Sequence, residues 1–193
     1  MKLKKCLIAN RGEIAVRIIR ACAELGIAPV AVYSEPDSAA LHVQLAAEAY
    51  PLAGTSAADT YLNIPKLLHI AADSGCDCVH PGYGFLSENE DFAAQVIAAG
   101  LVWVGPSADA IRRMGVKTEA RALMQAAGVP VVPGFQAAAA DDAAYQQAAH
   151  DIGYPVMVKA AGGGGGKANP LVLAPDELPP NLAGARPEAL QAL

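Results

Sequence analysis

The sequence predicts an α/β fold built around a mostly parallel sheet. From residue 5 to about residue 160, short apolar runs alternate with longer segments of helical periodicity, an order typical of repeated strand–helix units. Of the 193 residues, 53% are hydrophobic and 17% are charged, so the chain can bury a sizeable core. The length allows one complete domain and part of a second.

The first half of the chain supplies the strands and helices of this sheet. Apolar runs predict strands at residues 6–9, 30–33, 49–52, 77–79 and 102–104. The first strand is followed by a helix in which Ile14, Ile18 and Cys22 recur at i+4 intervals and therefore face the sheet. Further helices are predicted at residues 64–72 and from a capping box at residues 87–90 onward.

A second domain is expected to begin at residue 116. Helical patterns occupy residues 107–114, 117–127 and 142–152. A strand is predicted at residues 155–160, and its two-residue alternation puts Met157 and Lys159 on one face. Five glycines follow at residues 162–166. Residues 168–193 contain five prolines and no sustained period after residue 173, so this tail is expected to pack poorly.

Composition argues against several classes of partner and location. With 14 basic and 19 acidic side chains, the net charge of −5 leaves no basic footprint for nucleic acid or for a membrane surface. No stretch approaches the length of a membrane span, and the N-terminus lacks the apolar core of a signal peptide. The four cysteines lack zinc-site spacing. We therefore expect reduced thiols in a cytoplasmic protein.

Lys159 and the glycines after it form the first candidate ligand site. Glycines let several backbone N–H groups approach phosphate oxygens. A glycine run alone is more often a flexible linker, but a linker rarely follows a strand that carries a lysine three residues earlier. The residues therefore favour a phosphate-covering hairpin over a tether. They match neither a dinucleotide fingerprint nor a P-loop, because the turn at residues 10–12 has one glycine and no Ser or Thr follows Lys167.

Other charged residues have two interpretations each. Lys117 lies at the start of a predicted helix, where a bound anion would compensate its poor position relative to the helix dipole; a solvated surface lysine is an equal alternative. For His80, a hydrogen-bonded structural role is favoured over catalysis, although strand ends often carry ligand sites. Arg11 and Glu13 favour an internal ion pair at the first turn over ligand binding. One helix face, either solvated or a partner surface, carries Arg17, Arg20 and Glu24.

Three segments resemble the biotin carboxylase family in order and spacing: residues 8–18 (IANRGEIAVRI), 80–89 (HPGYGFLSEN) and 159–166 (KAAGGGGG). The first two motifs are long and specific, and the resemblance covers residues 3–167. It implies a Rossmann-like pre-ATP-grasp domain over residues 1–115 and the beginning of an ATP-grasp domain over residues 116–167, whose glycine-rich lid closes on the triphosphate. Residues 168–193 are then a divergent, poorly ordered tail.

The resemblance implies an ATP-dependent ligase. The family uses ATP with Mg²⁺ or Mn²⁺ to activate bicarbonate as carboxyphosphate, and carboxylates biotin on a biotin carboxyl carrier protein that works with a carboxyltransferase. The positions that match ATP contacts are Lys117, Lys159 and the lid glycines Gly163, Gly164, Gly165 and Gly166. The family is commonly dimeric, and Arg20 and Glu24 match positions at that interface.

Two departures from the family pattern bear on activity. The family's Gly-Asp-Lys is Gly115-Val116-Lys117 here, and its Gly-Met after the glycines is absent, since Lys167 is followed by residues 168–170, Ala-Asn-Pro. The metal-binding glutamates, the bicarbonate-binding arginine and the acid/base residues of the family have no counterpart in the tail. These 193 residues alone are therefore expected to be inactive, and a truncated or frame-shifted reading frame would explain the change.

Two other functions stay open. One is a non-catalytic module that keeps the dimer interface of a biotin-dependent carboxylase. The other is an ATP-grasp ligase of the carbamoyl-phosphate synthetase type, which lacks the motif at residues 80–89. The sequence also leaves open which complex the chain serves, among acetyl-CoA, other acyl-CoA, pyruvate and urea carboxylases.

Overall fold

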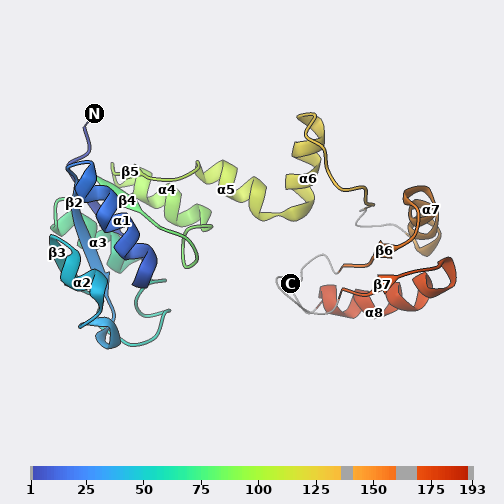
Figure 1. The fold of residues 1–193 in the computed structure, drawn as a ribbon, viewed down its shortest axis with the longest axis horizontal. Helices are drawn as coiled ribbons and strands as arrows, with labels where there is room; N and C mark the ends of the chain where they lie inside the picture. The colour runs from blue at the N-terminus through green and yellow to red at the C-terminus, as the bar shows by residue number, and fades with distance from the viewer. Residues whose placement is uncertain (1, 136–140, 160–168, 191–193) are drawn as a thin grey trace. The chain divides into compact units, whose positions relative to one another are not determined.

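The computed structural model describes residues 2–135, 141–159 and 169–190 (Figure 1). The chain divides into two compact units, residues 1–120 and 121–193. Each unit has its own buried core, and each is described by itself below.

The first unit contains a five-stranded sheet in the order β3-β2-β1-β4-β5. All neighbouring strands in it are parallel, so their carboxyl ends meet at one edge. The strands are β1 (Lys5–Ile8), β2 (Ala28–Tyr33), β3 (Glu48–Pro51), β4 (Cys78–His80) and β5 (Val102–Trp103). β1 and β2 are short apolar runs because helices cover both faces of a parallel sheet. The predicted α/β class with a parallel sheet is confirmed.

Helices cover both faces of this sheet (Figure 1). On one face, α1 buries Ile18 and Cys22 against β1 and β4, as its i+4 pattern predicts. On the other face, Leu67 of α3 and Phe92 of α4 pack into the larger core. The elements are α1 (Gly12–Glu24), η1 (Glu35–Asp37), α2 (Leu41–Leu45), α3 (Ile64–Asp73), α4 (Glu90–Ala98), α5 (Ala108–Gly115) and α6 (Lys117–Ala126).

The predicted capping box at residues 87–90 is wrong. Helix α4 begins at Glu90, and its N-cap is Asn89, whose side-chain oxygen accepts from the Phe92 N–H at 2.7 Å. Ser87 lies outside the helix because its own N–H donates to the Gly84 carbonyl in a preceding turn. An Asn that satisfies a free N–H of the first turn is a good cap in its own right.

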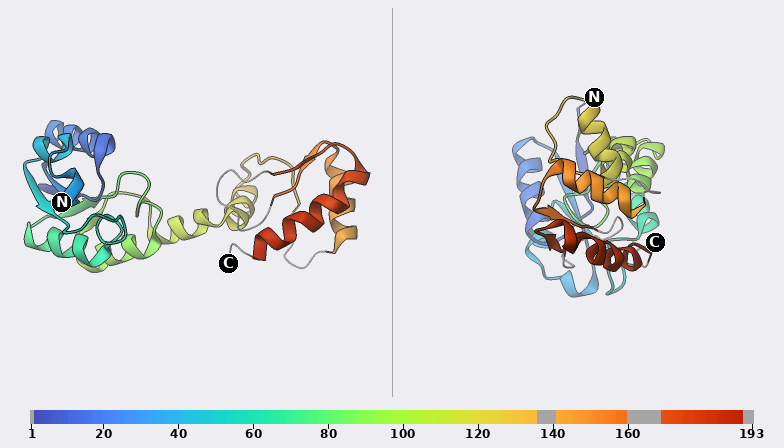
Figure 2. Two further views of the ribbon diagram at one scale, coloured as in Figure 1. Left: turned by 90° about the horizontal axis from the view of Figure 1, so that it is seen from below. Right: turned by 90° about the vertical axis from the view of Figure 1, so that its right-hand side faces the viewer.

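The second unit is a two-stranded antiparallel sheet with two helices. Figure 2 shows α7 and α8 beside β6 and β7. Val156 pairs with Val172, and Met157 with Leu171. Ala149, Val172, Leu178 and Leu182 form its buried core. The elements are α7 (Asp142–Ile152), β6 (Val156–Met157), β7 (Leu171–Val172), η2 (Pro175–Glu177) and α8 (Leu178–Leu190).

The expectation of a poorly packed tail is wrong for residues 171–185. β7 completes the small sheet, and Leu178 and Leu182 of α8 are buried one helical turn apart. Pro179 and Pro180 fall in the first turn of α8, where the N–H that proline lacks would have no helical acceptor. The prolines therefore allow a helix to start there.

Candidate functional site

An ion pair joins two strand ends at the carboxyl edge of the parallel sheet. Arg11, which directly precedes α1, donates from Nε and Nη2 to the two Asp37 carboxylate oxygens, both at 2.5 Å. Asp37 also accepts from the Tyr61 hydroxyl at 2.5 Å and from Ser34 Oγ at 3.2 Å. The Arg11 guanidinium holds the pKa of Asp37 well below its usual range. The expected internal ion pair therefore exists, but the partner of Arg11 is Asp37 and not Glu13.

Asn10 and Glu13 hold the loop after β4. Asn10 is buried, and its Nδ2 donates to the Pro81 and Tyr83 carbonyls, both at 2.8 Å. Gly82 has φ +67°, and a Cβ there would lie 2.7 Å from Asn10 Nδ2. The exposed Tyr83 hydroxyl donates to the Glu13 carboxylate. The loop is thus fixed at two points, by Asn10 to the turn after β1 and by Glu13 to the first turn of α1.

His80 has the structural role that the sequence favours. Its Nδ1 accepts from the Gly82 N–H at 3.0 Å, and burial lowers the pKa of its imidazole. A neutral ring with the proton on Nε2 fits this bond, because Nδ1 must carry a lone pair to accept. His80 therefore helps to shape the loop at residues 81–85.

Lys66 holds together the chain segment that follows β3. From α3, its ammonium donates to the carbonyl oxygens of Leu52, Ala53 and Asp59 at 2.7, 2.8 and 2.7 Å. An ammonium group has three donors, so this arrangement uses all of them on backbone oxygens. The loop at residues 52–59 is therefore gathered around one positive charge.

The two candidate phosphate-binding lysines belong to different units. Helix α6 begins at Lys117, as predicted. Lys159 is exposed just after β6, which is shorter than the predicted strand at residues 155–160. The predicted alternation is confirmed around it, because Met157 is exposed while Val156 and Val158 pack against the second core. The predicted lid glycines, Gly163, Gly164, Gly165 and Gly166, lie outside the described residues.

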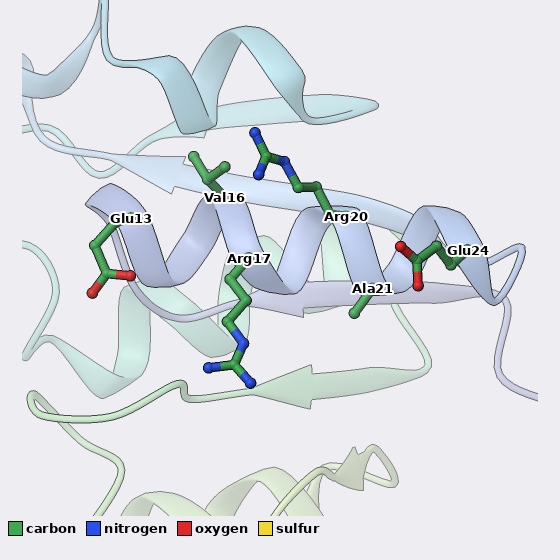
Figure 3. Close-up of a pocket in the computed structure, with 6 residues that line it drawn as sticks. All are labelled: Glu13, Val16, Arg17, Arg20, Ala21 and Glu24. Atoms are coloured by element: carbon green, nitrogen blue, oxygen red, sulfur yellow. The ribbon is translucent and has the colours of Figure 1, made fainter.

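The outer face of α1 presents charged side chains (Figure 3). Arg20 and Glu24 lie one turn apart and are exposed, and in the figure Arg17 leaves the opposite edge of the helix from Arg20. Among the described residues, neither Arg20 nor Glu24 makes an ion pair or a side-chain hydrogen bond. A pocket lies along this face, and the residues that line it are Glu13, Val16, Arg17, Arg20, Ala21 and Glu24.

Metal-binding and membrane-spanning features are absent from the described part of the chain. Across residues 2–135, 141–159 and 169–190, no three His, Cys, Asp or Glu side chains form a group that could hold a metal ion. In the same ranges, no helix is both long and apolar enough to cross a bilayer.

Sequence reasoning missed three residues at the carboxyl edge: Asn10, Asp37 and Tyr61. Asn10 and Asp37 each follow a strand by a few residues, and β1 and β2 are neighbours. Polar residues directly after adjacent parallel strands meet at one edge of the sheet, so strand order would have brought these two together. Tyr61 gave no such signal, because it lies in a turn remote from any strand end.

Two family profiles match the chain in sequence order. The profile of the carbamoyl-phosphate synthase L chain ATP-binding domain matches residues 116–193. The profile of the biotin carboxylase N-terminal domain matches residues 2–111, more than half of the chain. The chain belongs to the biotin carboxylase family. In this family member, the parallel sheet lies in the segment that matches the N-terminal domain. The second unit lies in the segment that matches part of the ATP-binding domain.

Known biotin carboxylases resemble this family member along nearly its whole length. Biotin carboxylase 1 of Bacillus subtilis is 53% identical over 176 residues, which are 91% of this chain and 39% of the relative. A Hydrogenobacter thermophilus 2-oxoglutarate carboxylase structure shows a biotin carboxylase domain dimer with MgADP, ADP and bicarbonate; it is 45% identical with a TM-score of 0.83, over 100% of this chain and 42% of that one. The Campylobacter jejuni biotin carboxylase–β,γ-ATP complex is 40% identical with a TM-score of 0.85, over 99% and 43%.

The extent of these matches corrects one expectation. The resemblance was expected to stop at residue 167, but the ATP-binding profile runs to residue 193. The tail thus belongs to the segment that matches the ATP-binding domain, which agrees with its packing in the second unit. The chain spans about two fifths of the length of the relatives it matches.

Proposed function

We propose that this chain is the N-terminal part of a biotin carboxylase that uses ATP and bicarbonate to form carboxyphosphate and then carboxylates biotin on a carrier protein. The observation that carries the proposal is the match of two profiles, in the order N-terminal domain then ATP-binding domain, from residue 2 to residue 193. The relatives' complexes with MgADP, bicarbonate and a nucleotide support the same chemistry.

In this proposal, Lys117 and Lys159 contact ATP, and Gly163, Gly164, Gly165 and Gly166 cover its phosphates. Ammonium groups and backbone N–H groups offset negative charge on the transferring phosphoryl group. Lys159 is exposed after β6, on the same face as Met157, where its ammonium can meet a ligand. A closed lid also keeps water from the carboxyphosphate, which would otherwise hydrolyse.

The 193 residues alone do not complete the reaction in this proposal. In this proposal other parts of the enzyme hold Mg²⁺ or Mn²⁺, and we derive no step through the metal. Relatives are more than twice as long as this chain. The carrier protein and the carboxyltransferase are the partners of the whole enzyme.

Helix α1 supplies a homodimer interface in this proposal, through Arg20 and Glu24. The two side chains are exposed and make no ion pair among the described residues, so both charges are available. In the proposed interface Arg20 of one protomer faces Glu24 of its partner, and because a two-fold axis repeats every contact, this pair would occur twice. A relative's biotin carboxylase domain is a dimer.

A chimaera tests the catalytic proposal. The chain is joined to the remaining C-terminal part of the Bacillus subtilis relative, and ADP release is measured with bicarbonate and free biotin. We expect biotin-dependent ATP turnover, reduced on the order of 100-fold by Lys159→Ala and unchanged by Lys4→Ala, which removes another exposed lysine. A folded chimaera without turnover, or one in which Lys159→Ala has no effect, contradicts the proposal.

Charge reversal in the same chimaera tests the dimer. Arg20→Glu and Glu24→Arg should each weaken the dimer at least about tenfold in sedimentation experiments, because each places like charges opposite one another. The double variant should restore it, since the pair is then exchanged. If the double variant is as weak as the single ones, Arg20 does not face Glu24 of the partner.

A further inference from the structure

A cluster of buried thiols lies between the parallel sheet and α1. Cys6, Cys22 and Cys78 share one apolar core there, and all three are reduced. Cys76 is also buried, but it belongs to the core on the opposite face of the sheet. Three thiols therefore meet in one place, and the fourth is separated from them by the sheet itself.

Within this cluster, Cys6 and Cys78 are direct neighbours across two strands. They are register partners in the parallel pair β1–β4, so their side chains leave the sheet on the same face. The Cys78 sulfur lies 3.6 Å from the carbonyl oxygen of Lys5, the residue bonded to Cys6. A hydrogen bond from the Cys6 thiol lowers the pKa of the Cys78 thiol, and both side chains lie in the same buried core.

The spacing of the strands decides whether a disulfide between these two sulfurs would be strained. Neighbouring strands lie about 4.8 Å apart, and because register partners on parallel strands point the same way, their Cβ atoms are about that far apart too. A disulfide can span this Cα separation, but it prefers about 3.8 Å between its Cβ atoms. Closing the bond must therefore draw β1 and β4 together by about 1 Å at this point. Strain of this kind makes a disulfide easier to reduce, as in labile rather than structural bridges.

We propose that Cys6 and Cys78 form a reversible disulfide in response to peroxide. The Cys78 thiol loses its proton and its sulfur attacks one peroxide oxygen; the O–O bond breaks, a sulfenic acid forms, and the released hydroxide takes up that proton and leaves as water. The Cys6 thiol then attacks that sulfur, the S–S bond forms, and a second water leaves. Two thiols lose two electrons and two protons, and one hydrogen peroxide becomes two waters.

A disulfide at this position would affect the carboxyl edge of the sheet, because both of its strands lead there. β1 leads directly to Asn10 and Arg11, and β4 leads to the loop at residues 81–85. Between the cysteines and these segments, the Ala9 N–H donates to the His80 carbonyl at 2.9 Å. Drawing β1 toward β4 therefore acts on the two segments that Asn10 holds together.

Peptide mapping of the folded 193-residue chain tests the proposal. The chain is treated with hydrogen peroxide, its remaining thiols are alkylated in denaturant, and tryptic peptides are analysed by mass spectrometry. Trypsin places Cys6 in residues 6–11, Cys22 in residues 21–66, and Cys76 and Cys78 together in residues 67–112. We expect a link between residues 6–11 and 67–112 that reduced glutathione removes without denaturant.

Cys76→Ala is the matched control, because it leaves Cys78 as the single thiol of the last peptide and changes a side chain in the other core. The link should persist in Cys76→Ala and disappear in Cys78→Ala. The proposal is overturned by the absence of a link, by a link to residues 21–66, by loss of the link in Cys76→Ala, or by resistance to glutathione. If Cys78→Ala does not fold, the unmodified chain and Cys76→Ala still decide.

Discussion

At the scale of single residues, the hydrogen bonds of Asp37 tie the ends of β1 and β2 to the turn that contains Tyr61. Three side chains donate to its carboxylate: Arg11, Tyr61 and Ser34. All of these bonds favour the ionised form. The stability of the first unit should therefore depend on pH through this one carboxylate.

Because the folded-state pKa of Asp37 is depressed, its contribution is complete above the ordinary Asp pKa of about 4 and is lost as the pH falls through the folded-state pKa. At pH 7, Asp37→Asn should lower the free energy of unfolding by about 2 kcal/mol. The difference between the two proteins should shrink steadily below about pH 4. Urea unfolding at several pH values measures this, with exposed Asp73→Asn as a control that should stay within about 0.5 kcal/mol.

Substitutions at Gly82 and Gly84 distinguish the cost of backbone strain from the cost of a steric clash. Both have positive φ, but a Cβ at Gly82 would meet Asn10 Nδ2 at 2.7 Å, whereas a Cβ at Gly84 meets nothing within 4 Å. Gly84→Ala should therefore cost only the left-handed conformation, about 1 kcal/mol. Gly82→Ala should cost about 1–2 kcal/mol more, because Asn10 must also move. Equal losses in chemical denaturation would contradict the role of Asn10 as the support of this loop.

These residues show where sequence reasoning ends at this scale. The motif at residues 8–18 contains Arg11 and Glu13, and a charged pair at the first turn was a sound expectation. Nothing local identifies Asp37 as the partner, because it lies 26 positions away and meets Arg11 only through the pairing of β1 with β2. Tertiary partners of this kind depend on strand order, which the local pattern does not encode.

At the scale of elements, regular periodicity was predictable and short segments were not. The i+4 stripe of α1 and the apolar strand runs placed these elements within a few residues. Helix α2, with five residues and no complete amphipathic repeat, was missed. A segment this short depends on tertiary contacts for its helicity; in α2 these include the buried His42, whose Nε2 lies 3.3 Å from the Val32 carbonyl.

Helix α4 offers a test of its cap. Asn89→Ala should lower the free energy of unfolding by about 1 kcal/mol, since the Phe92 N–H loses its acceptor. Ser87→Ala, at the position that the sequence favoured, should change it by less than about 0.5 kcal/mol. Thermal and urea unfolding of both variants distinguish the two caps. A larger loss for Ser87→Ala would restore the capping box.

At the scale of the whole molecule, the two units differ in how far the sequence predicted them. The parallel sheet follows from its buried apolar runs. The second unit depends on the pairing of β6 with β7 across the glycines and on the packing of α8. The number of prolines suggested a loosely packed tail, but their positions matter more than their number. Two of them fall in the first turn of α8, where a helix tolerates proline.

Packing of the tail can be measured directly. Leu182→Ala removes a buried side chain from the second core and should destabilise that unit by about 2–3 kcal/mol. Leu173→Ala, at a 62% exposed position, should have almost no effect. Hydrogen exchange followed by mass spectrometry should show faster exchange in residues 141–159 for Leu182→Ala alone. Unchanged exchange in that variant would mean that α8 does not support α7.

Three backbone carbonyl oxygens surround the Lys66 ammonium in the first unit. Oxygen atoms arranged in this way resemble the inner coordination shell of a monovalent cation. Here the cation is covalently attached to α3, so its effective concentration at the oxygens is set by the fold and not by the buffer. It cannot be diluted, exchanged for sodium or potassium, or removed by a chelator. The segment after β3 is therefore organised around a cation that is part of the chain itself.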